Sequence, residues 1–227
     1  MSPRPVTSVQ CGWRLTVTSS KGSRGNKRRA IIKAAARLFR HKGYERTTVR
    51  DLAKAVRIQS GSIFFHFDSK EQILEAVIEE GMRRAVAALD AAVAQAHSPR
   101  EKMSAILHTH LRQTLGDERD TFVVLMLDWR ALPPRSRLRT VKFRDEYERH
   151  IGQVLEDLAR DGVVHQNTPL LRLFLLGALN WTILWYRQDG RLTIDELADA
   201  FLDLLLPNAG RKPVPESAVD SMARFGR

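Results

Sequence analysis

The chain has 227 residues, 43% of them hydrophobic, which is enough apolar material for one large core or for a small domain joined to a larger one. Its single cysteine, Cys11, cannot form a disulfide within the chain, so the composition argues against a disulfide-stabilised secreted fold. The net charge of +11 is uneven, because residues 1–70 hold 16 Lys and Arg against 3 Asp and Glu and the remainder is nearly neutral. This distribution is typical of a DNA-binding domain attached to a neutral body, and a solvated basic surface is the alternative.

The N-terminal segment is predicted to be an arm followed by a helix. Residues 1–25 mix Ser, Thr, Gly, Pro and Arg without periodicity, which predicts a flexible basic arm. They lack a continuous apolar core of signal-peptide length, so we expect a cytoplasmic protein. A first helix is predicted from Asn26 to His41, with Gly43 ending it. Lys27 lies at its start, where it can contact a DNA phosphate, although a solvated tail fits equally well.

Residues 47–66 predict two short helices separated by a tight turn. In the first, Val49, Leu52 and Val56 recur at i, i+3 and i+7, which gives a buried stripe and leaves Arg50 facing solvent. The second is too short to be stable alone, but it has two apolar residues four apart that can anchor it to the first. This arrangement is a helix-turn-helix, whose second helix enters the major groove of DNA.

The same stretch resembles the DNA-binding motif of the TetR family of transcriptional repressors. The residues that match the family pattern or replace it conservatively are Thr48, Leu52, Ala53, Val56, Ile58, Gly61, Ser62, Ile63, His66, Phe67, Ser69, Lys70 and Glu71. Three positions depart from it: Arg57 replaces a turn glycine, Gln59 replaces a capping serine, and Phe64 replaces a tyrosine that often contacts phosphate. At Arg57, either the backbone adopts a conformation that favours glycine or the turn differs. Ser60 is available as the cap in place of Gln59.

The candidate DNA contacts lie in and around this motif. On the second helix, Gln can pair with adenine, Ser is permissive, and Phe can contact a thymine methyl group. Either Thr47 or Thr48 caps the first helix, and a hydroxyl there can also bind phosphate. For Phe64, packing in the core is the alternative to DNA contact. The full set of candidates is Lys27, Thr47, Thr48, Arg50, Gln59, Ser60, Ser62, Phe64, Phe65, His66 and Lys70.

Apolar periodicity and capping signals predict six further helices and no strand, so the expected fold class is all-α with about nine helices. A long helix from Ser69 to about Ala96 joins an N-terminal three-helix DNA-binding domain, residues 26–85, to a helical body, residues 86–206. Residues 207–227 are predicted to be a C-terminal tail. The other helices are expected at about 98–115, 121–132, 135–160, 170–187 and 194–206.

The last two helices are the expected dimer surface. The helix after Leu170 is apolar nearly all round, and in the TetR family the corresponding helices form a four-helix interface between two subunits. Burial of both helices inside one subunit is the alternative. The apolar run Leu173–Tyr186 is too short to span a membrane and contains Asn180, which favours a buried helix. The candidate dimer contacts are Leu173, Leu176, Leu179, Leu197, Phe201 and Leu204.

The middle helices are expected to form a small-molecule pocket, as the resemblance implies, because apolar residues there are interspersed with a few polar ones. The candidate pocket residues are His108, Arg112, Phe122, Met126, Trp129, Tyr147, Asn180 and Trp181. His108 and His110 lie two apart, on different faces of a helix, so they are poor joint metal ligands. No catalytic motif indicates an enzyme, and no cofactor is expected.

The resemblance implies a homodimeric regulator that binds a palindromic DNA operator and is released from it by a small-molecule effector. The C-terminal section is also similar to TetR-type regulators linked to acyl-CoA and lipid catabolism, which suggests an acyl-CoA or another lipophilic effector. A constitutive, dimeric architectural DNA-binding protein without an effector is the alternative.

Overall fold

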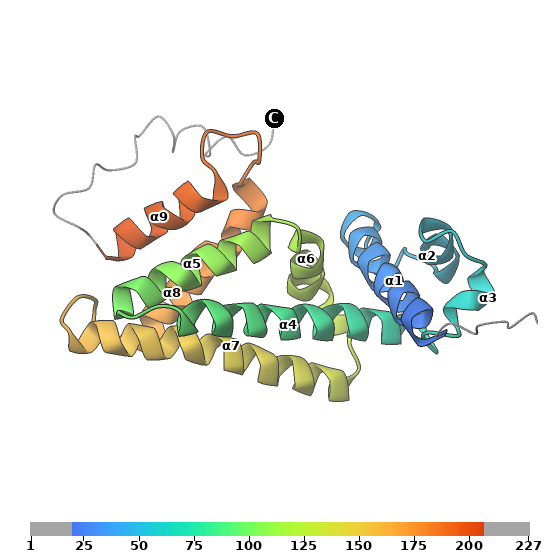
Figure 1. The fold of residues 1–227 in the computed structure, drawn as a ribbon, viewed down its shortest axis with the longest axis horizontal. Coiled ribbons are helices and arrows are strands. Elements are labelled where there is room, and N and C mark those ends of the chain that lie inside the picture. Colours follow the sequence, from blue (N-terminus) through green and yellow to red (C-terminus); the bar gives the residue numbers. More distant parts are fainter. Residues whose placement is uncertain (1–19, 207–227) are drawn as a thin grey trace, which may run out of the picture.

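The fold is described from a computed structural model, in which residues 20–206 are placed. These residues form nine α-helices, one short 3₁₀ helix and no strand, so the all-α prediction is confirmed (Figure 1). The elements are α1 (Ser20–Lys42), α2 (Val49–Ala55), α3 (Ser60–Ile63), α4 (Lys70–Ala94), α5 (Pro99–Leu115), α6 (Arg119–Asp128), η1 (Trp129–Ala131), α7 (Pro134–Arg160), α8 (Thr168–Trp185) and α9 (Ile194–Leu205). In Figure 1, α1, α2 and α3 gather at one end of the molecule and α4 runs from them into the body. The predicted arm at residues 1–19 and the tail at residues 207–227 lie outside the described residues.

The N-terminal domain, α1 to α3 with the start of α4, has its own core. The fully buried side chains that meet there include Ile31, Phe39, Leu52, Ile63, Phe67, Ile73 and Leu74. The α2 and α3 helices are too short to be stable in isolation, so this packing holds α3, the recognition helix, in place against α2, which in turn packs on α1.

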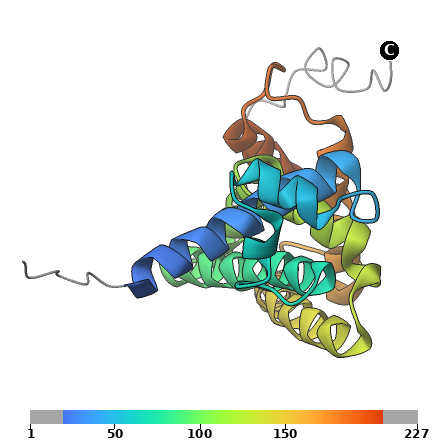
Figure 2. The same cartoon turned by 90° about the vertical axis from the view of Figure 1, so that its right-hand side faces the viewer.

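Helix α1 is longer than the sequence predicted. It begins at Ser20 instead of Asn26, so the last residues of the predicted arm are helical. Figure 2 shows this end of α1 projecting from the rest of the molecule. The described side chains from Gly25 to Ala30 are exposed, and an exposed polar helix has no apolar periodicity for a sequence pattern to detect. The predicted stop is confirmed, because Gly43 follows α1 with a φ of 86° and its amide donates to the Phe39 carbonyl.

Helix α2 begins at Thr48, which resolves the choice between two threonines. The Thr48 hydroxyl accepts from the Asp51 amide, and the Asp51 carboxylate accepts from the Thr48 amide, a complete capping box. The hydrogen bonds from Lys42 and Thr48 hold the pKa of Asp51 well below its usual value. The prediction that Ser60 caps α3 was wrong, because the helix starts one residue earlier and Gln59 is its N-cap without a side-chain hydrogen bond.

The turn between α2 and α3 contains Arg57, which has a φ of 56°. Of the two alternatives that the sequence left open, the backbone therefore adopts the left-handed conformation. This conformation costs a non-glycine residue roughly 1–2 kcal/mol, and the surrounding turn maintains it through hydrogen bonds from the Arg57 and Ile58 amides to the carbonyls of Lys54 and Ala53.

Helix α6 packs against the N-terminal domain and against the long helix α4. Its buried residue Val124 belongs to the core of the N-terminal domain, as does Leu132, just after η1. The Asp120 carboxylate accepts from Arg40 of α1 at 2.6 Å in a half-buried ion pair. On its other side, α6 crosses α4 at Gly81, where an added Cβ would overlap the Thr121 methyl group. Helix α6 therefore contacts both α1 and α4 directly.

The body has a second core built around α5, which packs against α4, α6, α7, α8 and α9. Helix α9 lies along α5 and α8 packs on α7, so the last two helices cover different parts of the body. The prediction that α8 is a buried core helix was wrong. Only 28% of it is buried, although by length and composition it is the one described helix apolar enough to cross a membrane.

Candidate functional site

The N-terminal domain presents an exposed surface around α3. Only Ile63 of this helix is fully buried, and Gln59 at its start is exposed. Phe64 and Phe65, directly after it, are 53% and 82% exposed. Phe64 is therefore not packed in the core, so the alternative to DNA contact that the sequence left open for it is wrong. An aromatic side chain as exposed as Phe65 has no packing role within the chain, which is consistent with contact to a partner.

The other candidate DNA contacts fall into two groups. The exposed side chains are Lys27, Thr48 and Arg50, and the half-buried side chains are Ser60, Ser62 and His66. Two candidates are corrected. Thr47 is buried, and its hydroxyl donates to the Gly43 carbonyl at 2.8 Å, so this side chain stabilises the loop and is not part of the exposed surface.

The second correction concerns Lys70. Its ammonium donates to the carbonyls of Tyr44 and Glu45 at 3.1 and 3.3 Å, and it lies 4.3 Å from the Tyr44 ring centroid. These contacts hold the loop that follows α1, because carbonyls and an aromatic face both attract a cation. The Lys70 backbone amide, in the first turn of α4, is the part that remains available to a phosphate.

Two arginines outside the candidate set lie near these residues. Arg28 of α1 lies 4.8 Å from the ring centroid of Phe67, so it fastens α1 to the segment that follows the recognition helix. Arg57 is exposed in the turn of the motif. The sequence showed that Arg57 departs from the family pattern, and this departure was considered only for its effect on the backbone. That Arg57 is also an exposed cation in the turn before the recognition helix was overlooked.

Replacing Arg57 with Gly is expected to raise the free energy of unfolding by about 1 kcal/mol, because glycine adopts a positive φ without steric cost and only part of that gain is lost to chain entropy. Urea unfolding measures the change. Lys54→Gly is the matched control, since it also exchanges an exposed cation for glycine, but within α2, where it should lower stability by about 1 kcal/mol. If the free energy of unfolding decreased in both variants, the proposed backbone strain at Arg57 would be contradicted.

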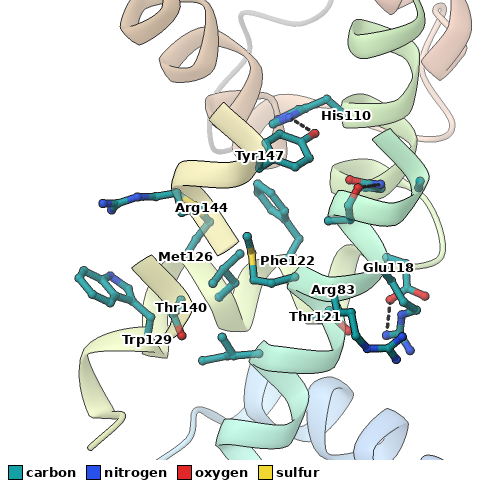
Figure 3. Close-up of a pocket in the computed structure, with 18 of the residues that line it drawn as sticks. Arg83, His110, Glu118, Thr121, Phe122, Met126, Trp129, Thr140, Arg144 and Tyr147 are labelled. Carbon is teal, nitrogen blue, oxygen red and sulfur yellow. Dashed lines mark hydrogen bonds and ion pairs between the residues drawn. The ribbon is translucent and has the colours of Figure 1, made fainter. Parts of the chain in front are cut away.

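A cavity of about 720 Å³ lies in the body between α4, α5, α6, α7 and α8 (Figure 3). Its size is that of a small-molecule site. Five of the eight predicted pocket residues line it: Phe122, Met126, Trp129, Tyr147 and Asn180. Phe122 and Met126 project into its centre from α6, the helix that also packs in the N-terminal domain.

The other three predicted pocket residues lie elsewhere. His108 contacts Asp195 and Asp199 of α9 at 3.3 and 3.1 Å, and Arg112 donates to Asp195 at 2.9 Å, so both side chains hold α9 on α5. Trp181 is 59% exposed and does not line the cavity. The prediction chose residues on the wrong faces of their helices, because residues one or two positions apart on a helix point in different directions.

The residue that was missed is His110, which the sequence analysis considered only as a metal ligand together with His108. It is buried, and its Nδ1 lies 3.0 Å from the Tyr147 hydroxyl and its Nε2 lies 3.2 Å from Asn180 Oδ1. Burial lowers the pKa of His110 to about 4, despite the hydrogen bond with Asn180, and burial raises the pKa of Tyr147. These three residues, the His110 relay, are therefore uncharged at neutral pH.

Arginines line the more exposed parts of the cavity wall. Arg84 forms ion pairs with Glu80 and Glu118, both at 2.9 Å, whereas Arg83 is exposed. Arg144 is exposed on α7 and lies 3.6 Å from Glu148. Figure 3 shows Arg144 on one side of the cavity and the Arg83 and Glu118 group on the other, with the apolar residues between them. The site thus combines an apolar interior with charge near its openings.

Helix α8 carries a continuous exposed apolar surface, the α8 face, formed by Leu170, Leu173, Phe174, Trp181 and Leu184. These residues are each about half exposed or more and recur at helical spacing. Two of the predicted dimer contacts are corrected, because Leu179 and Leu197 are buried in the core of their own subunit. Leu176 and Phe201 are partly buried against that core, and Leu204 is 81% exposed on α9.

Comparisons with known proteins agree with these features. Residues 31–77 match the family model of bacterial regulatory proteins of the tetR family, and residues 96–208 match the model of the tetracyclin repressor-like C-terminal domain. The chain is 27% identical over 192 residues to the HTH-type transcriptional repressor KstR2 of Rhodococcus jostii, covering 83% of this chain and 92% of that protein.

Two solved structures have the same fold. The TetR family transcriptional regulator PfmR from Thermus thermophilus is 33% identical, with 80% of this chain and 99% of that chain covered and a TM-score of 0.72. AibR, solved in complex with isovaleryl coenzyme A and operator DNA, is 24% identical, with 80% and 98% covered and a TM-score of 0.73. The chain therefore belongs to the TetR family of DNA-binding transcriptional repressors.

Proposed function

We propose that two copies of this repressor bind a palindromic operator through their N-terminal domains and release it when a lipophilic effector enters the cavity of the body. The observation that carries the proposal is the double role of α6, which lines the cavity with Phe122 and Met126 and packs in the N-terminal core with Val124. The site of action is the cytoplasm, where the chromosome lies.

The operator contacts are proposed to come from Gln59, Phe65 and the exposed cations Arg50 and Lys27. The concentration of basic residues in the first 70 positions supports this, because neutralising phosphates gives affinity for any DNA sequence. Specificity requires contacts to base edges, and an amide and an exposed aromatic ring beside α3 provide them for adenine and for the thymine methyl group.

The dimer is proposed to form through the α8 face, together with Leu204 of α9. A two-fold dimer matches two half-sites of a palindrome, and the same surface on each subunit can meet its copy. An exposed apolar row along an 18-residue helix favours such a partner over solvent.

The effector class proposed is an acyl-CoA or another elongated lipophilic compound. The apolar interior suits a hydrocarbon portion, and Arg83 and Arg144 near the openings suit an anionic group. The isovaleryl coenzyme A bound by AibR supports this class for a protein of the same fold.

Release is proposed to follow from movement of α6 and α4. A ligand that displaces Phe122 shifts α6, and the ion pair between Asp120 and Arg40 carries the shift to α1. A preference of the ligand for one arrangement of about 1–3 kcal/mol would change operator affinity several-fold to a hundredfold.

The test is binding to an operator selected from random DNA and to a scrambled duplex, with and without added decanoyl-CoA. Gln59→Ala and Phe65→Ala should each weaken binding to the operator by about 10-fold and leave the scrambled duplex unaffected. Gln95→Ala, at the exposed end of α4, is the control and should change neither affinity. Decanoyl-CoA should weaken operator binding by the wild type.

The alternative is an architectural DNA-binding protein without an effector. It would bind both duplexes similarly, with an equally steep dependence on salt, and Gln59→Ala would have no selective effect. Equal operator affinity with and without decanoyl-CoA and the other lipophilic compounds tested would count against effector control.

A further inference from the structure

The buried end of the cavity presents hydrogen-bonding groups without a net charge. Tyr147 and His110 are almost completely buried, whereas Arg83 and Arg144 at the openings are exposed. We propose that the effector carries an uncharged oxygen, a hydroxyl or a ketone, on the part that enters deepest, and that Tyr147 and Asn180 bind this oxygen. The inference rests on the proposed function, in which the cavity holds an effector.

The hydrogen bonds of the His110 relay leave one donor and one acceptor for a ligand. If Nε2 carries the proton, it donates to Asn180 Oδ1, and Nδ1 accepts from the Tyr147 hydroxyl. The Asn180 amide nitrogen is then a donor and the Tyr147 oxygen an acceptor, and both residues line the cavity. A hydroxyl group uses both, and a ketone accepts from Asn180.

The other tautomer leads to the same conclusion. If Nδ1 carries the proton, it donates to the Tyr147 oxygen, and Nε2 accepts from the Asn180 amide in its flipped orientation. The phenol hydrogen is then the donor and the Asn180 oxygen the acceptor. In either tautomer, one of Tyr147 and Asn180 is a donor and the other an acceptor for the ligand oxygen, and His110 stays uncharged.

A carboxylate is a poor occupant of this end. Burial keeps His110 unprotonated at neutral pH, so the relay supplies no cation. In Figure 3 the Arg144 side chain points away from Tyr147 and His110, and Arg83 lies on the opposite side of the cavity. An anionic group therefore fits near the openings, and the neutral oxygen fits at the buried end.

A plain hydrocarbon is also a poor occupant. It would cover the Tyr147 hydroxyl and the Asn180 amide without offering either group a hydrogen-bond partner. The loss expected is about a factor of 10 in affinity relative to the same chain with an oxygen at this position. Phe122, whose ring is 5.9 Å from that of His110, limits the space beside the relay and favours a small oxygen group.

The experiment compares decanoyl-CoA with its 9-oxo and 10-hydroxy derivatives by isothermal titration calorimetry on the full-length protein. At least one oxygenated thioester should bind wild type about 10-fold more tightly than decanoyl-CoA. Tyr147→Phe and Asn180→Leu should reduce this ratio to about 2 or less. Thr140→Val is the control, because it removes a hydroxyl of the cavity wall that donates to the Ser136 carbonyl, and it should keep the ratio.

The outcomes separate the inference from the function on which it rests. If all three thioesters bind wild type with equal affinity, the neutral-oxygen inference is wrong and the lipophilic effector stands. If the ratio survives in Tyr147→Phe and Asn180→Leu, the oxygen is bound elsewhere and the assignment to the relay is wrong. If none of the thioesters binds, the proposed effector class is itself wrong.

Discussion

Replacing Trp181 with Glu is expected to convert the repressor into a monomer and to weaken operator binding by at least about 100-fold. Trp181 is 59% exposed and is the largest side chain of the α8 face. In the proposed dimer, a carboxylate at this position would be buried against a copy of itself with no cation to pair with it. A monomer reaches only one half-site, so it loses the high effective concentration of the second N-terminal domain.

Light scattering at several protein concentrations and operator binding measure the two effects. Leu138→Glu is the control, because Leu138 is 66% exposed on α7 and lies outside the α8 face. This control should remain dimeric with unchanged operator affinity. A dimeric Trp181→Glu protein with normal operator binding would refute the proposed interface, and far-ultraviolet circular dichroism should show the wild-type helix content in both variants.

The α8 helix also shows where sequence patterns reach their limit. Its composition identified an apolar helix correctly, but Leu179 faces the core of its own subunit and Leu173 faces outward. Both positions require an apolar residue, one for folding and one for a partner, so composition alone cannot separate them. Only the placement of α5 and α7 against α8 distinguishes the two faces.

The helix-turn-helix could be predicted more completely because its determinants are local. The cap of α2, the apolar spacing and the stop at Gly43 involve residues close together in the sequence, and the structure places Thr48, Ile63 and Phe67 accordingly. The cavity could be predicted only in part. His108 and His110 have the same side chain, and which of them faces the cavity depends on the rotation of α5 against α9 and α7.

The buried imidazole of His110 makes a second strong prediction, a loss of stability in acid. The pKa of His110 is about 4 in the folded protein and about 6.5 in the unfolded chain. Because the unfolded state takes up the proton first, stability from this residue is complete above pH 6.5 and falls as the pH decreases toward 4. The loss is about 3 kcal/mol over this interval, from about 1.4 kcal/mol for each unit of difference in pKa.

Urea unfolding between pH 7.5 and 4 measures the loss, and His110→Gln isolates it. Glutamine can donate to Asn180 and accept from Tyr147 but does not titrate, so the variant should be less stable at pH 7.5 and show a smaller decrease toward pH 4. His41→Gln, an exposed position on α1, is the control and should follow the wild-type curve. If the His110→Gln curve ran parallel to the wild type, the imidazole would be able to ionise in the folded state. The buried end of the cavity could then accept an anion, and the uncharged character that the relay requires would be lost.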